Sequence, residues 1–151
     1  MPGFISDSPL AQDLIRIGDE AIANEDEPKL RNYFTEDYVF HGPGRDLAFE
    51  ELRAYFASLR SAFSGLRIIR EQIIADGNFL AARTRFSGGF NDVFTYSPIG
   101  PVEPTGKHVE WEVIGTFRYN DDGRLAEEWV QSDYRSLLIK LGVTVTESAV
   151  R

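Results

Sequence analysis

The sequence predicts an α+β fold in which amino-terminal helices pack on one face of a strongly curved, mainly antiparallel sheet and enclose a pocket. Apolar residues recur at helical spacing up to about residue 63, and an apolar–polar alternation typical of strands begins at Leu66. Helices followed by strands in this order favour a helical layer against an antiparallel sheet. A sheet that bends around its long helix leaves a cone-shaped cavity, and small molecules bind in such cavities.

The amino-terminal half contains three expected helices and one short strand. A serine followed by Pro9 predicts a helix start, because the hydroxyl caps the first turn and proline needs no hydrogen bond there. Apolar spacing continues to about residue 24, and a short second helix follows. The strand is expected at residues 38–41. A third helix is expected over about residues 48–63, with Asp46 placed to cap it.

Four strands are expected in the carboxyl-terminal half, arranged as two hairpins. The first hairpin joins residues 66–75 to residues 79–90 through Asp76-Gly77-Asn78. The second spans residues 106–134 and turns at Asn120-Asp121-Asp122-Gly123, because glycine and its Asx neighbours tolerate the positive φ of tight turns. Each pair of strands should therefore lie antiparallel.

The connections around these hairpins complete a single domain over residues 1–151. Residues 91–106 contain three prolines, too many for a sheet interior, and are interpreted as a flap at a pocket rim or an arm at a dimer contact. A short closing helix is expected from Tyr134 to Leu141, ended by glycine. Residues 143–151 are expected to form a loose tail.

The second hairpin carries the most informative side-chain pattern. Strand alternation places five residues of its first strand on one face: Val109, Trp111, Val113, Gly115 and Phe117. The same alternation places five residues of the second strand on one face: Leu125, Glu127, Trp129, Gln131 and Asp133. Two carboxylates and an amide beside a large aromatic ring are unusual for a purely structural face. The sequence leaves two registers for the pairing of these strands, which differ by one residue. In one register Asp133 faces Glu112, and in the other it lies beside Trp111.

Composition excludes several classes of function. The net charge of −8 argues against nucleic acid and anionic membranes as partners, because both are bound through clustered Lys and Arg. Cysteine is absent, which excludes disulfides and thiolate chemistry and is consistent with a cytoplasmic protein. Neither a signal peptide nor an apolar run long enough for a membrane span is expected.

Several motifs together resemble those of a known family. They are Pro104-Thr105-Gly106-Lys107, Asp122-Gly123-Arg124-Leu125-Ala126-Glu127-Glu128-Trp129, Asp133, Leu137-Leu138 and Leu141-Gly142. The pattern resembles SnoaL-like polyketide cyclases and their "ester cyclase" relatives, which belong to the NTF2-like superfamily of α+β cones. The resemblance runs from Leu10 to Gly142 and is most specific in the carboxyl-terminal half.

The resemblance implies an activity and an assembly. It implies a homodimer that binds a hydrophobic small molecule and closes a ring by an intramolecular aldol reaction without metal or cofactor. Asp133 falls on the acidic residue that serves as general acid/base in the characterised cyclases. Residues 90–94 stand where many relatives have a shorter connection, so the substrate shape can differ. The superfamily also supplies alternatives: a non-catalytic ligand-binding dimer, an isomerase, or an epoxide hydrolase with an Asp-Arg-Asp set.

Each candidate catalytic residue also has a structural interpretation. Asp133 suits the cap of the helix that begins near Tyr134. His41 ends a short strand, from which it either faces the cavity mouth or forms a structural hydrogen bond. Arg83, which shares a strand face with Arg85, either positions or polarises the substrate or forms a cross-strand ion pair.

Seven further residues are candidates for the substrate pocket because they combine large apolar surfaces with single polar groups. They are Trp129, Trp111, Gln131, Phe86, Tyr38, Tyr55 and Phe56. A metal site is not predicted. His108, Glu110 and Glu112 share a strand face, but a single imidazole with two carboxylates fits a solvated or dimer-facing polar strip better.

Overall fold

A computed structural model of the chain describes residues 3–145. These residues form four α-helices and a six-stranded mixed sheet, which confirms the expected α+β class. The strand order in the sheet is β2-β1-β6-β5-β4-β3. The helices are α1 (Pro9–Ile17), α2 (Glu27–Tyr33), α3 (Phe49–Ala62) and α4 (Tyr134–Lys140). The strands are β1 (Phe34–Gly42), β2 (Arg45–Ala48), β3 (Phe63–Asp76), β4 (Phe79–Phe90), β5 (His108–Tyr119) and β6 (Leu125–Ser132).

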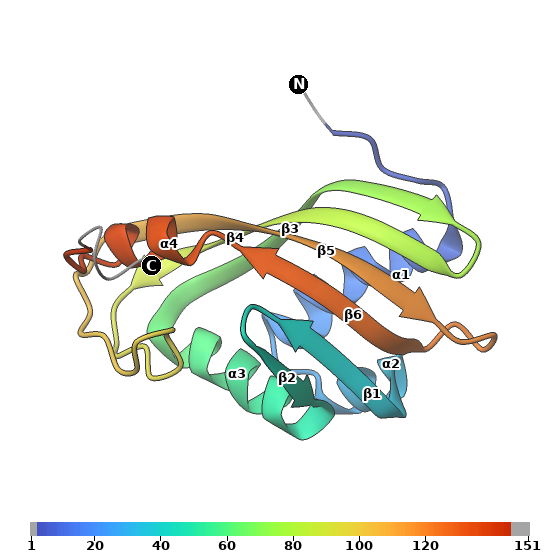
Figure 1. Cartoon of the computed structure of the whole chain (residues 1–151), viewed down its shortest axis with the longest axis horizontal. Coiled ribbons are helices and arrows are strands. Elements are labelled where there is room, and N and C mark those ends of the chain that lie inside the picture. Colours follow the sequence, from blue (N-terminus) through green and yellow to red (C-terminus); the bar gives the residue numbers. More distant parts are fainter. Residues whose placement is uncertain (1–2, 146–151) are drawn as a thin grey trace.

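The helices and the sheet form two layers. Figure 1 shows α1 and α2 on the far side of the bent sheet and α3 beside the β1–β2 hairpin. Only β1 and β6 run parallel, and every other neighbouring pair is antiparallel. We call the side of the sheet that faces α1 and α3 the inner face and the opposite side the outer face.

The expected capping residue is found at the start of α1 but not at the start of α3. Ser8 caps α1, and its hydroxyl accepts a hydrogen bond of 3.3 Å from the Leu10 N–H. A π-helical turn at Gly18–Ile22 then continues the helix close to its expected end. The expected cap of α3 by Asp46 is wrong, because Asp46 belongs to β2. Instead, the side chain of Glu51 accepts a hydrogen bond of 3.2 Å from the Ala48 N–H.

Paired residues form rows that cross the sheet and show which side chains share a face. One inner row, given by the strand registers, runs Ala75, Leu80, Phe117, Glu128, Phe40 and Leu47. The adjacent outer row runs Ile74, Ala81, Thr116, Trp129, His41 and Asp46. The inner row therefore carries a carboxyl group among apolar side chains, while the histidine lies on the outer face.

A β-bulge in β6 sets this arrangement. Arg118 pairs with Glu127 and Tyr119 pairs with Leu125, so Ala126 has no partner of its own on β5. One extra residue moves every later side chain of the strand to the opposite face. The expected alternation that placed Glu127, Trp129 and Gln131 beside Leu125 is therefore wrong. The side chains of Glu128, Val130 and Ser132 point inward instead.

The core is rich in aromatic side chains. Trp111 is 5% exposed and packs between Phe63 and Phe86, with ring centroids 4.9 and 5.4 Å away. Offset and tilted ring pairs of this kind add to the stabilisation from apolar burial. The long connection 91–106 contains no strand longer than the isolated bridge between Phe94 and Val102, whose side chains are both buried.

Two further expectations were a loose carboxyl-terminal tail and the lack of a membrane-spanning segment. The predicted tail, residues 143–151, extends beyond the described part of the chain from residue 146 onward. Within residues 3–145, no helix has the length and apolar character that crossing a membrane requires.

Candidate functional site

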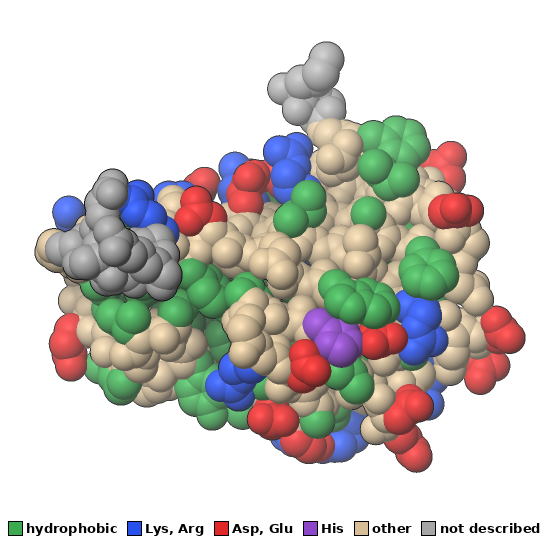
Figure 2. Space-filling view, viewed as in Figure 1, with side chains coloured by type: hydrophobic (Ala, Val, Ile, Leu, Met, Phe, Trp, Pro, Cys, Tyr) green, Lys and Arg blue, Asp and Glu red, His purple; other side chains and the backbone are tan. Residues whose placement is uncertain are grey.

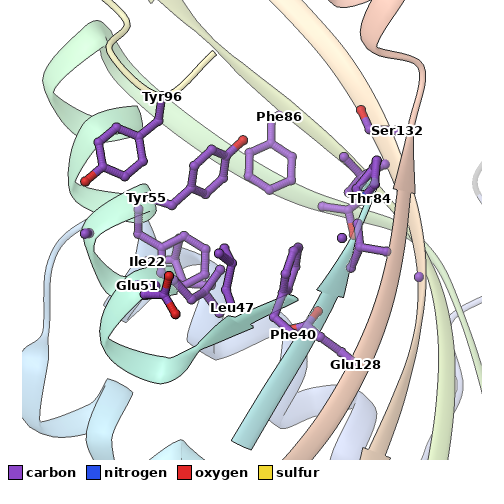
Figure 3. A pocket seen from close by; sticks show the side chains of 18 of the residues that line it. Ile22, Phe40, Leu47, Glu51, Tyr55, Thr84, Phe86, Tyr96, Glu128 and Ser132 are labelled. Carbon is purple, nitrogen blue, oxygen red and sulfur yellow. The ribbon is translucent and has the colours of Figure 1, made fainter. Parts of the chain in front are cut away.

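A large cavity lies between the inner face of the sheet and the helices. Its volume is about 870 Å³, which is large enough for a multi-ring small molecule. Figure 3 shows Tyr55, Phe86 and Phe40 around the open space, with Glu128 at its edge. Tyr96 and neighbouring residues of the 91–106 connection also line the cavity, which favours the interpretation of this segment as a pocket rim.

Glu128 places a carboxyl group in this cavity. Its residue surface is only 7% exposed, and Tyr38 donates a hydrogen bond to Oε1. Burial raises the pKa of the Glu128 carboxyl to about 7, because the ionised form loses its hydration. The hydrogen bond from Tyr38 and the positive charge of Arg70 act in the opposite direction, and both are weaker than burial. Near neutral pH, Glu128 is therefore available both as an acid and as a base.

Arg70 brings a positive charge to the same cavity. Its Nη1 donates to Thr84 Oγ1 at 2.9 Å, and its Nε donates to the Leu14 carbonyl at 3.4 Å. Burial lowers the pKa of the guanidinium from its ordinary value. Arginine stays protonated at neutral pH even when buried, so this side chain supplies a fixed cation.

Two tyrosines add hydroxyl groups near the charged pair. The hydroxyls of Tyr33 and Tyr119 form a hydrogen bond with each other. Burial raises the pKa of both groups well above the ordinary value of tyrosine. They therefore act as neutral donors and acceptors.

The structure places four of the expected pocket residues, Trp111, Phe86, Tyr55 and Phe56, in the cavity wall. Their apolar surfaces account for much of the lining. Tyr38 does not line the cavity, but its hydroxyl donates a hydrogen bond to Glu128, which does. A role in substrate binding stays a prediction for each of them.

Asp133 lies outside the cavity. It is the N-cap of α4, where its Oδ1 accepts a hydrogen bond of 2.9 Å from the Ser136 N–H, and the residue is exposed. The carboxylate therefore does not line the cavity, as a general acid/base acting on a substrate bound there would have to. The physical reason is that β6 ends at Ser132 and the chain turns outward into the helix.

Replacing Asp133 with Ala should therefore lower the free energy of unfolding by about 1 kcal/mol through loss of the cap. Asp133→Asn, which can still accept the hydrogen bond, should change it by only a few tenths of that amount. Urea denaturation measures both. Any catalytic rate should stay within about twofold of the wild-type rate in both variants, because neither side chain reaches the cavity. A large loss of rate with unchanged stability would restore the catalytic interpretation of Asp133.

Three other expected site residues lie on the outer face. His41 Nδ1 is 2.9 Å from Asp46 Oδ1 and His41 Nε2 is 2.6 Å from Glu127 Oε2, and the imidazole stacks on Trp129. The contact with Glu127, followed by that with Asp46, raises the pKa of His41 above its ordinary value. Gln131 is exposed on the same face. Figure 2 shows a histidine between acidic side chains on this surface.

The remaining candidates also point away from the cavity. Arg83 is exposed, and its Nη1 lies 3.9 Å from Glu112 Oε1, so it forms the weak cross-strand pair that was the alternative interpretation. His108 Nε2 lies 3.2 Å from Glu110 Oε1. Within residues 3–145, no group of three or more His, Cys, Asp or Glu side chains is arranged to hold a metal ion.

Sequence reasoning did not identify the polar residues that the cavity contains. Glu128 was hidden by the bulge, because simple alternation assigns it to the face opposite Leu125. Arg70 was missed because it lies in a strand of mixed polarity. The sequence did contain a signal that separates Tyr38 from His41. Residues three apart in a strand lie on opposite faces, so only one of these two side chains could enter the pocket.

Comparisons with known proteins agree with the fold described above. A family model described as SnoaL-like polyketide cyclase matches residues 12–141. No curated protein sequence matches the chain. A candidate SnoaL-like polyketide cyclase from Jannaschia sp. CCS1 has 19% identity and a TM-score of 0.76, and the match covers 93% of this chain and 99% of that one.

Two Streptomyces structures are also similar. IdmH from Streptomyces antibioticus, a candidate polyketide cyclase, has 24% identity and a TM-score of 0.72, with 90% of this chain and 100% of that chain covered. AclR from Streptomyces galilaeus, a candidate hydroxylase, has 21% identity and a TM-score of 0.71, with 88% and 92% covered. At these identities each likeness concerns the fold alone.

Proposed function

The chain belongs to the SnoaL-like polyketide cyclase family, and we propose that it closes a ring in a hydrophobic carbonyl compound with Glu128 as the general acid/base. In this proposal the reaction is an intramolecular aldol addition and needs neither metal nor cofactor. The observation that carries the proposal is the buried carboxyl group of Glu128, which lines the cavity and has a pKa of about 7. A group with this pKa can accept and return a proton near neutral pH.

The proposed reaction uses Glu128 twice. The ionised carboxylate first removes a proton from a carbon next to a carbonyl group and leaves an enolate. The enolate carbon then bonds to the carbon of a second carbonyl group, whose oxygen becomes an alkoxide. The carboxylic acid of Glu128 returns the proton to that oxygen. The carboxyl group ends as it began, and the product is an isomer of the substrate.

Tyr38 supports this proposal as a positioning residue. Its buried hydroxyl donates to Glu128 Oε1 from β1, the neighbouring strand. This hydrogen bond fixes one oxygen and leaves Oε2 without a protein hydrogen-bond donor within residues 3–145. The second oxygen is therefore the one that would exchange a proton with a substrate.

The acidic side chains that are buried favour ring closure over the epoxide hydrolase alternative. An epoxide hydrolase of this superfamily would need two aspartates around an arginine. Among the described residues, Glu128 is the only acidic side chain in the buried set. One buried carboxyl group suits a reaction in which a single acid/base moves a single proton.

The proposal is tested with a generic hydrophobic ketone before the natural substrate is known. In D₂O, the wild-type protein should accelerate exchange of the α-protons of 2-tetralone for deuterium, measured by ¹H NMR against buffer of equal pH and ionic strength. A non-catalytic carrier would bind the ketone and leave the exchange rate unchanged. Binding without exchange across pH 6–9 would therefore contradict the proposal and support the carrier.

We also propose that the protein is a homodimer formed through the outer face of the sheet. Two large apolar side chains stand open there, Ile114 with 58% and Trp129 with 40% exposure. Both charge signs surround them, including Arg83 and Glu112, so a second copy related by a twofold axis could pair with them. Val113 and Val130, which lie next to Ile114 in the sheet, line the cavity on the inner face.

Ile114→Glu should convert this dimer into a monomer, because two unpaired carboxylates would be buried at the twofold contact. Sedimentation equilibrium at about 10 µM protein measures the change. Ile139→Glu is the matched control, since Ile139 is 48% exposed but lies on α4. A monomeric wild-type protein, or equal dissociation in both variants, would contradict the proposed interface.

A further inference from the structure

His41 lies on the outer face between two carboxylates that belong to different strands. The β1–β2 register pairs His41 with Asp46, and the β1–β6 register pairs it with Trp129. The bulge at Ala126 directs Glu127 to the same face, where its carboxylate contacts the imidazole. The sheet therefore brings groups of β1, β2 and β6 together, although β6 is far from the other two strands in the sequence.

Both ring nitrogens of His41 face a carboxylate oxygen. Nδ1 lies 2.9 Å from Asp46 Oδ1, and Nε2 lies 2.6 Å from Glu127 Oε2. A neutral imidazole carries one N–H group and one nitrogen lone pair, whereas the imidazolium carries two N–H groups. Only the protonated form can therefore donate to both carboxylates. In the neutral form, one carboxylate faces a lone pair and needs water as its donor instead.

The charges around His41 balance only when its imidazole is protonated. Asp46 on β2 and Glu127 on β6 contact the imidazole, and Arg118 on β5 donates to Glu127 Oε1 at 3.2 Å. Within residues 3–145, Asp46 has no ion-pair partner other than His41. With His41 protonated, the cluster holds two cations and two carboxylates. With His41 neutral, it holds one unbalanced negative charge.

Water still reaches this cluster in the single chain. Trp129 stacks on the imidazole with ring centroids 5.3 Å apart and is 40% exposed, and Figure 2 shows a hydrophobic side chain against the histidine. The side chains of His41 and Glu127 are also partly exposed. A contact that covers Trp129 would therefore remove water from the imidazole and its carboxylates. A carboxylate that loses water without gaining a donor is strongly unfavourable.

We propose that a second copy of the chain covers the stacked side chains of Trp129 and His41, and that this contact is stable only while His41 is protonated. The inference rests on the proposed homodimer and names its central contact and its regulation. The occupant is a second copy because the outer face carries both charge signs around exposed apolar side chains, which a twofold axis can match. The dimer takes up protons as it forms and dissociates as the pH rises.

The pH range follows from the surroundings of the histidine. In the single chain, the contacts with Glu127 and Asp46 already raise the pKa of His41 above its ordinary value of 6.5. Covering the cluster raises this pKa further, because only the protonated form keeps both hydrogen bonds. The resulting stabilisation of the dimer is fully present below the pKa of the single chain, and it is lost as the pH rises through the pKa of the dimer. Dimerisation should therefore be strongest near pH 6 and weaken toward pH 9.

The test measures the dissociation constant of the dimer by sedimentation equilibrium at a series of pH values from 6 to 9. For the wild-type chain, the constant should rise by about tenfold or more over this range, since each dimer loses a proton from two histidines. His41→Gln keeps one donor and one acceptor but cannot be protonated in this range. Its constant should change by less than about threefold.

The matched control is His108→Gln, because the chain contains only two histidines and His108 contacts Glu110 at the start of β5. This variant should keep the wild-type pH dependence. Glu128, which also titrates in this range, is the same in all three proteins. If His41→Gln does not fold, the wild-type chain and His108→Gln decide the question.

Three results would overturn the inference and leave the proposed dimer standing. They are a wild-type dissociation constant that does not rise with pH, an equal rise in His41→Gln, and a rise that disappears in His108→Gln. A chain that stays monomeric at every pH would contradict the dimer and this inference together. The 2-tetralone exchange assay tests the proposed catalytic function independently of both.

Discussion

Replacing Glu128 with Gln should lower the rate of α-proton exchange by about 10²-fold or more. The amide has nearly the same shape as the carboxyl group and can keep a hydrogen bond with Tyr38. It has no ionisable proton in the range of pH 5–9, so it cannot act as the acid/base. The same loss should appear in the rate of ring closure when a substrate is found. Exchange into 2-tetralone, measured by ¹H NMR, gives the rate.

The adjacent residue provides a matched control. Glu127→Gln makes the same chemical change one position earlier in β6, on the outer face, where Glu127 contacts His41 and Arg118. This variant should keep a rate within about twofold of the wild-type rate, because Glu127 is half-buried on the outer face and does not line the cavity. Equal losses in both variants would show that the effect is structural. A loss confined to Glu127→Gln would contradict the assignment of the inner and outer faces.

The same substitution should change the pH dependence of stability. The folded-state pKa of Glu128 is about 7, above the ordinary glutamate value of 4.5 that describes the unfolded chain. The folded state therefore favours the protonated form. This contribution is fully present below about pH 4.5, and it is lost as the pH rises through about 7. Raising the pKa from 4.5 to about 7 corresponds to a loss on the order of 3 kcal/mol between those limits.

Urea denaturation of the wild-type protein and Glu128→Gln at a series of pH values measures this loss. The free energy of unfolding of the variant minus that of the wild-type protein should rise by on the order of 3 kcal/mol between pH 4.5 and 8.5. The comparison removes the contribution of His41, whose raised pKa affects both proteins equally. A difference that is constant with pH would mean that the carboxyl group of Glu128 is solvated in the folded state.

Much of the fold was predictable because long periodic segments dominate the sequence. The helical stripe of α3, the hairpin turn at Gly77 and the turn at Gly123 each specify local structure through spacing or positive φ. The aromatic wall of the cavity followed from the same alternation, since Trp111 and Phe86 pair directly on β5 and β4. Both strands keep a regular register in that region, so their faces could be read from sequence.

The polar centre of the site could not be predicted, because it depends on two bulges. The extra residue Ala126 places Glu128 inside and its neighbour Glu127 outside, and the extra residue Glu71 keeps Arg70 inside. A bulge has no strong sequence signal of its own, and one residue of slip reverses a strand face. The sequence instead favoured Asp133 and His41, which the structure places on a helix cap and on the outer face.

A bulge in β6 holds the Glu128 carboxyl group in the cavity, where it is largely shielded from solvent. The most direct test of this placement is the titration of side-chain carboxyl ¹³C resonances by NMR, with Glu128→Gln used to assign the signal of Glu128. We expect that signal to titrate near pH 7 and to shift when 2-tetralone binds. A Glu128 signal that titrates near the ordinary glutamate pKa of 4.5 and does not shift when the ketone is added would contradict this placement of the carboxyl group.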